Sequence, residues 1–122
     1  MIRKRILIAD DEELIRIIVR LALGDAYETS EAADGEEAWQ KFVAADPNFD
    51  LLILDWNMPR LAGRELLERI IARDPQARVL LLSGRLDCPV KTAAQVRLMS
   101  KPFNNSELTN TVAELLANPG KY

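Results

Sequence analysis

Short runs of apolar residues alternate along the chain with longer stretches whose apolar residues recur at helical spacing. Three of the runs, at residues 6–9, 51–54 and 79–82, contain no polar residue and stop at an aspartate or a serine. Such runs are typical of strands that are covered on both faces, as in a parallel sheet. Residues 27–32 and 96–99 are more polar, and we predict them as weaker strands, with 27–32 at a sheet edge.

The stretch after the first run has the spacing of an amphipathic helix. Its apolar residues fall on one face, which we predict to be the buried face: Leu14, Ile17, Ile18 and Leu21. Arg16 and Arg20 lie outside this face, and Gly24 marks the helix end. Two further helices are predicted to end at the Asp-Pro pairs 46–47 and 74–75, because the residue before a proline is disfavoured in a helix.

The last helix is predicted to begin after Asn104, which has the spacing of a capping box with Glu107. Strands and helices therefore alternate, which predicts an α/β fold: a five-stranded parallel sheet with helices on both faces. Only residues 84–95 remain between the fourth and fifth strands, and a parallel crossover needs about a dozen residues. We therefore expect the fourth helix to be short, irregular or absent.

Composition excludes several classes of function. The 122 residues predict a single domain, residues 1–122, and 48% hydrophobic with 29% charged residues is typical of a soluble globular chain. With no histidine and one cysteine, an internal disulfide, the usual zinc site and a histidine-based catalytic triad are excluded. The net charge of −3 argues against direct nucleic-acid binding. No run is long enough for membrane insertion, and we expect a cytoplasmic protein.

Polar residues collect where the predicted strands end. Asp10 and Asp11 follow the first strand, and Asp55, Ser83 and Lys101 follow the third, fourth and fifth. Because the carboxyl ends of parallel strands share one edge, where ligands bind in α/β sheets, we expect these side chains to converge. Three neighbouring carboxylates repel one another unless a cation joins them, and oxygen ligands suit Mg²⁺ or Mn²⁺. A carboxylate nucleophile, a divalent metal and a lysine are the parts needed to make an aspartyl phosphate, and Ser83 adds a hydrogen-bond donor.

Each of these residues also has a purely structural interpretation. Asp10 suits a helix cap, Asp55 and Ser83 suit turns, and Lys101 alone suits a solvated charge. Their combination, in order and at the ends of four strands, favours the phosphoacceptor interpretation.

In these residues the chain resembles the receiver domain of two-component response regulators. Asp10-Asp11, Asp55, Ser83 and Lys101-Pro102-Phe103 match the family's motif in order, and the likeness covers nearly the whole chain. It implies a flavodoxin-like (CheY-like), doubly wound sheet of order 2-1-3-4-5. It also implies a signalling switch that accepts a phosphoryl group from a sensor histidine kinase or a histidine phosphotransfer protein. Phosphorylation would change the surface offered to a downstream protein target or output domain.

The resemblance further implies a role for each site residue. The implied Mg²⁺ ligands are Asp11 and Asp55 directly, the backbone carbonyl of Asn57, and Asp10 through water. Asp55 would be the phosphoacceptor, Lys101 would contact the phosphoryl group and Ser83 would move onto it. The Lys101–Pro102 bond is expected to be cis. Such a chain is no enzyme in the ordinary sense, because it catalyses only its own phosphorylation and dephosphorylation.

Two features depart from the family's pattern. Leu98 stands where the family usually has an aromatic residue that rotates inward when the hydroxyl moves, and residues 84–95 are fewer than usual. Both favour a second hypothesis, a pseudo-receiver that binds partners without this relay, whereas the complete set of acids, hydroxyl and lysine favours a switch. A hydrolase of the haloacid-dehalogenase type would carry its nucleophile after the first strand and a second aspartate two residues later, which Asp10-Asp11-Glu12 does not match.

Overall fold

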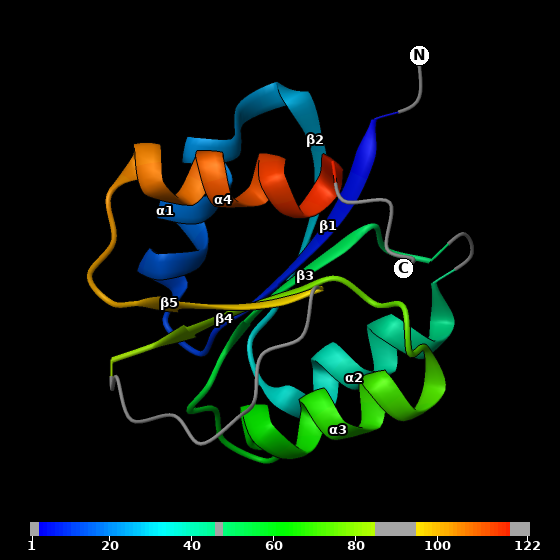
Figure 1. Ribbon diagram of the computed structural model, residues 1–122. Helices are drawn as coiled ribbons and strands as arrows, with labels where there is room; N and C mark the ends of the chain where they lie inside the picture. Colours follow the sequence, from blue (N-terminus) through cyan, green and yellow to red (C-terminus); the bar gives the residue numbers. More distant parts are fainter. Residues whose placement is uncertain (1–2, 46–47, 85–94, 118–122) are drawn as a thin grey trace.

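The structure is a computed structural model that describes residues 3–45, 48–84 and 95–117. Its strands form one parallel sheet of order β2-β1-β3-β4-β5, which confirms the predicted flavodoxin-like arrangement (Figure 1). The strands are β1 (Lys4–Ala9), β2 (Tyr27–Ala32), β3 (Leu51–Asp55), β4 (Val79–Ser83) and β5 (Val96–Ser100). As predicted, β2 lies at a sheet edge, and the fully apolar strands occupy the centre.

Helices cover both faces of the sheet. They are α1 (Glu13–Leu23), the 3₁₀ turn η1 (Gly24–Ala26), α2 (Gly35–Ala44), α3 (Gly63–Arg73) and α4 (Asn105–Ala117). Helices α1 and α4 lie together on one face, and α2 and α3 lie on the other (Figure 1). The short fourth helix expected within residues 84–95 falls almost entirely outside the described residues, as does the predicted helix stop at 46–47.

Each face of the sheet has its own hydrophobic core. Alternate residues of the central strands point to opposite faces, so Leu52 and Leu54 pack with α2 and α3, whereas Leu51 and Ile53 pack with α1 and α4. All residues of β3 and β4 are buried. This two-sided burial is the reason that these strands show no alternation of apolar and polar residues.

The predicted buried face of α1 is wrong. Leu14 and Leu21 are 66% and 70% exposed, while Val19 and Leu23 are buried. Two apolar stripes overlap in this helix, and hydrophobicity alone does not choose between them. The stripe that packs against the sheet is instead formed by Ile15, Val19, Ala22 and Leu23, and Arg16 and Arg20 pair with Glu31 on β2 beside it.

The helix ends follow local sequence signals. Asn104 accepts a hydrogen bond from the Glu107 amide at 2.7 Å, which confirms its role as a cap of α4. Gly24 has a φ of 65° at the end of α1, a conformation that glycine adopts without strain. Helix α3 ends at Arg73, directly before the Asp-Pro pair at 74–75, as predicted. The Lys101–Pro102 bond is cis, also as expected.

Candidate functional site

The carboxyl ends of four strands bring the predicted site residues together. In the sheet register, Ala9 lies beside Leu54, Asp55 beside Leu82, and Ser83 beside Ser100. Residues that follow β1, β3, β4 and β5 therefore share one edge of the sheet. The Lys101 amide donates to the Ser83 carbonyl at 2.8 Å, which places the lysine directly at the end of β4.

Three carboxylates form a compact cluster at this edge. One oxygen from each of Asp10, Asp11 and Asp55 lies within 4.8 Å of the others. Asp10 and Asp55 are buried, and Asp11 is exposed to solvent. Carboxylate oxygens at this spacing, with one side open, are a donor set that suits a hard divalent cation such as Mg²⁺ and fits no softer metal.

Lys101 is shared between two of these carboxylates. Its Nζ lies 3.0 Å from Asp10 Oδ2 and 3.1 Å from Asp55 Oδ1, and its side chain is 18% exposed. A single ammonium thus bridges the ends of β1 and β3. It balances part of the negative charge of the three carboxylates and leaves the cluster net negative, which favours a divalent cation.

Burial and mutual charge shift the protonation of the site. Burial, and then the charge of Asp10, raise the pKa of Asp55 to about 6, although Lys101 and the Asn57 amide favour its carboxylate form. Burial alone would lower the pKa of Lys101, but the hydrogen bond and charge of Asp10, followed by those of Asp55, outweigh it and raise the pKa. The lysine is therefore positively charged near neutral pH.

The remaining predicted residues lie at the same edge. Ser83 is 3% exposed at the last position of β4. Asn57 is exposed in the loop after β3, and its amide lies 3.4 Å from Asp55 Oδ1. Asp10, Asp11, Asp55, Asn57, Ser83 and Lys101 thus all occur where the sequence places them, while the role of each remains a proposal.

The loop after Asp55 is held by close contacts that the sequence did not reveal. A Cβ atom added to Gly63 would lie 2.6 Å from the Asp55 carbonyl oxygen, and the Gly63 amide donates to the Trp56 carbonyl at 3.0 Å. At the other end of the loop, a Cβ on Gly35 would lie 1.9 Å from the carbonyl oxygen of Leu61. In the sequence, Gly63 marks only a helix start, because such packing joins distant segments.

Arg16 is the functional candidate that sequence reasoning missed. It was placed on the outer face of the helix, yet its side chain is 14% exposed and its Nη1 lies 2.6 Å from the Asp10 carbonyl oxygen. The only signal in the sequence was an arginine with apolar residues on both sides of it. The partners of Arg16 cannot be found from sequence spacing, because Arg16 lies on helix α1 and Glu31 lies on strand β2.

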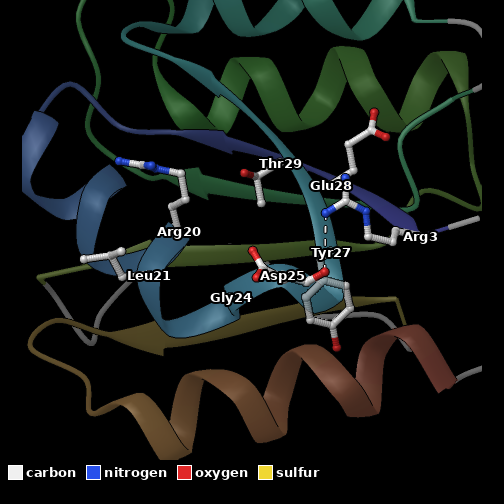
Figure 2. A pocket seen from close by; sticks show the side chains of 8 residues that line it. All are labelled: Arg3, Arg20, Leu21, Gly24, Asp25, Tyr27, Glu28 and Thr29. Atoms are coloured by element: carbon white, nitrogen blue, oxygen red, sulfur yellow. Dashed lines mark hydrogen bonds between the residues drawn. The ribbon is translucent and has the colours of Figure 1, made fainter.

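A hollow of about 360 Å³ lies elsewhere on the molecule, at the end of α1 and the start of β2 (Figure 2). Tyr27, which lines it, pairs with Lys4 at the amino-terminal edge of the sheet, away from the acidic cluster. Two arginines line this hollow, together with Asp25 and Glu28, and Arg3 donates to the Asp25 carbonyl at 3.3 Å. The charges balance, so the hollow does not have the character of an anion site.

The parallel sheet and the acidic cluster with its lysine define a flavodoxin-like domain with a metal-compatible site at the carboxyl ends of its strands. The sequence model of the response regulator receiver domain matches residues 6–113. The chain therefore belongs to the receiver domains of response regulators, which act in two-component signalling. Within the described residues, no helix has the length and apolar character needed to cross a bilayer.

Individual relatives resemble the chain over most of its length. Sporulation initiation phosphotransferase F of Bacillus subtilis is 31% identical over 95% of this chain and 96% of its own length. Transcriptional regulatory protein TrcR of Mycobacterium tuberculosis is 32% identical over 92% of this chain, which spans 45% of that protein. Response regulator protein TrrA of Thermotoga maritima, solved in complex with Mg²⁺-BeF, has a TM-score of 0.81 and 35% identity, covering 92% of this chain and 98% of that one.

Proposed function

We propose that this receiver domain is a phosphorylation-dependent switch in which Asp55 accepts the phosphoryl group. The observation that carries the proposal is the convergence of three carboxylates and one ammonium, from three separate strand ends, around the Asp55 side chain. Asp55 is a buried carboxylate with the ammonium of Lys101 beside it, so the nucleophilic oxygen and a cation for the phosphoryl group are already close together.

In the proposed transfer, Asp55 is the nucleophile, Lys101 contacts the phosphoryl group and Ser83 moves onto it. An Asp55 carboxylate oxygen attacks phosphorus, the bond from phosphorus to the donor breaks, and its electron pair leaves with the donor's imidazole or acetate. Lys101, already at hydrogen-bond distance from Asp55, donates to the incoming phosphoryl oxygens. Because Asp55 is modified in the reaction, the domain catalyses only its own phosphorylation and dephosphorylation.

The acidic cluster fits the Mg²⁺ ion that the reaction requires. Asp11 and Asp55 would bind it directly, Asp10 through water, and the Asn57 loop would contribute its backbone carbonyl. The ion would neutralise charge on the cluster and on the transferred group. The fold similarity to TrrA, which was solved with Mg²⁺-BeF, supports the same ligands as probes for this chain.

The phosphodonor requires a docking surface close to this edge. Leu14, Ile18 and Leu21 are 66%, 37% and 70% exposed, and their spacing places them along one face of α1. The stripe begins three residues after Asp11, at the end of α1 nearest the acidic cluster. We infer that it receives an apolar helix of a sensor histidine kinase or a phosphotransfer protein, so that the donor histidine reaches Asp55 in the cytoplasm.

A pseudo-receiver remains the second candidate, and one observation favours it. Leu98 on β5 occupies the usual aromatic position and is 38% exposed, so the described structure offers no aromatic ring there to follow Ser83 inward. In that case the domain would bind its partner through a fixed surface, whether or not Asp55 is modified.

Intact-mass measurement after incubation with Mg²⁺ and acetyl phosphate tests the proposal. We expect one phosphoryl group on the wild-type chain and none on Asp55→Asn or in EDTA. Trp56, next to the acceptor, should change its fluorescence when Mg²⁺-BeF is added. An unmodified wild-type chain with Mg²⁺ demonstrably bound would reject the switch, and phosphorylation without any change of the amide NMR spectrum beyond the site would favour the pseudo-receiver.

A further inference from the structure

We propose that Arg16 is a positioning residue that holds the turn between Asp10 and Asp11 in the shape that gathers the three carboxylates. This inference rests on the proposed Mg²⁺ site. Arg16 itself touches neither the metal position nor the acceptor, and acts through the Asp10 backbone.

The contact is short and shielded from water. Arg16 Nη1 donates to the Asp10 carbonyl oxygen at 2.6 Å, and Arg16 Nε donates to Glu31 Oε1 at 3.0 Å. The arginine side chain is 14% exposed, so water competes weakly for these bonds. Charged hydrogen bonds of this length are among the stronger ones in proteins.

The Asp10 carbonyl is the part of the turn that Arg16 controls. The Asp10 amide is bound to the Ala32 carbonyl at 3.1 Å, and its two carboxylate oxygens accept from the Glu12 amide at 2.8 Å and from Lys101 at 3.0 Å. The carbonyl lies in the peptide plane that leads to Asp11. Rotation of that plane would swing the Asp11 carboxylate away from Asp55, and the Arg16 bond opposes this rotation.

Glu31 fixes the guanidinium from the other side. Its carboxylate also forms an ion pair with Arg20 Nε at 3.3 Å, and its backbone carbonyl accepts a hydrogen bond from Lys41. The planar guanidinium donates in two directions at fixed angles, towards the turn and towards β2. A lysine ammonium at this position cannot reproduce both bonds with one geometry.

Mg²⁺ affinity is the property that this arrangement should control. Residues that orient metal ligands from the outer shell typically contribute 10–100-fold to metal affinity. We expect Arg16→Gln to raise the Mg²⁺ dissociation constant roughly tenfold. This is the lower end of the range, because Lys101 and the Glu12 amide still hold the Asp10 side chain. Arg16→Lys should restore only part of the affinity.

Arg20→Gln is the matched control. Arg20 pairs with the same Glu31 and lies on the same helix, but its contact does not extend to the turn, and its side chain is 47% exposed. Amide NMR shifts report Mg²⁺ binding for the wild type, both Arg16 variants, Arg20→Gln and Glu31→Gln. Hydrogen exchange at the Glu12 amide, measured without metal, reports the turn itself.

The expected result is weaker Mg²⁺ binding and faster Glu12 exchange in Arg16→Gln, a smaller change in Glu31→Gln, and wild-type behaviour in Arg20→Gln. Equal Mg²⁺ affinity in wild type and Arg16→Gln would overturn the inference, as would equal losses in Arg20→Gln. If Arg16→Gln fails to fold, Arg16→Lys and Glu31→Gln decide. A wild-type chain that binds no Mg²⁺ contradicts the proposed function instead, so the two failures are distinct.

Discussion

Asp55→Asn should stabilise the metal-free protein at neutral pH. Burial and the charge of Asp10 raise the pKa of Asp55 from 3.8 to about 6, so folding opposes its ionisation. At 1.36 kcal/mol for each pKa unit, the charged carboxylate costs about 3 kcal/mol of folding free energy. Asparagine has nearly the same shape and no charge. Lys101 loses one ionic partner but keeps Asp10, so we expect a net gain of about 1–3 kcal/mol.

The stability gained by Asp55→Asn should increase as the pH rises. The folded-state pKa lies above the unfolded value, so the folded state holds the Asp55 proton more tightly. This contribution to stability is complete below the unfolded value of 3.8 and is lost as the pH rises through about 6. Asparagine does not titrate. The stability difference between the variant and the wild type should therefore be small near pH 4 and reach its full size above about pH 7.

Urea unfolding of both proteins in EDTA, from about pH 4 to about pH 8, measures this difference directly. A thermal scan should show a melting temperature higher by roughly 5 °C in the variant at neutral pH. Added Mg²⁺ should narrow the gap, because it binds the folded wild type more tightly. A variant that is less stable than the wild type at neutral pH, or a difference that does not change with pH, would refute the picture of repelling buried carboxylates.

Three further substitutions test other parts of the structure. Arg60 has a φ of 70°, and its 3.6 Å ion pair with Asp34 is exposed on the arginine side. Arg60→Gly should therefore raise the free energy of unfolding by roughly 0.5–1 kcal/mol, and a lower free energy in urea unfolding would mean that the ion pair contributes more than the backbone strain costs. Gly63→Ala should lower it by about 2 kcal/mol or more, through contact with the Asp55 carbonyl, and an unchanged urea midpoint would contradict that contact. Leu14→Ser should slow phosphotransfer from a protein donor but leave labelling by acetyl phosphate unchanged; equal slowing of both would place the effect inside the site.

The sheet and its reactive edge could be predicted because their signals are local. Each central strand is an unbroken apolar run that ends at a polar residue, and parallel pairing alone then brings Asp10, Asp55 and Ser83 to one edge, where Lys101 joins them from the end of the edge strand β5. Neither the pairing partner nor its exact register is needed for that conclusion. The prediction that these side chains share one edge therefore holds even if the predicted strand ends are wrong by one or two residues.

What failed depends on contacts between distant segments. The rotation of α1 buries Val19 and Leu23 against the sheet and pairs Arg16 and Arg20 with Glu31 on β2, and no pattern within the helix reveals these partners. The hydrogen bond from Arg16 to the Asp10 carbonyl was missed for the same reason, since backbone acceptors leave no trace in a sequence. The close approach of Gly63 to the Asp55 carbonyl likewise exists only after β3 and α3 have packed.

Helix α1 serves two separate tasks on its opposite sides. Arg16 and Val19 face inward, towards the acidic turn and the core, whereas Leu14 and Leu21 face solvent. Outward positions can therefore change without disturbing the chemistry beneath them. If the exposed stripe selects the phosphodonor, exchanging these leucines between paralogous regulators should change which kinase phosphorylates each one. Duplicated signalling pathways could then diverge through surface substitutions alone.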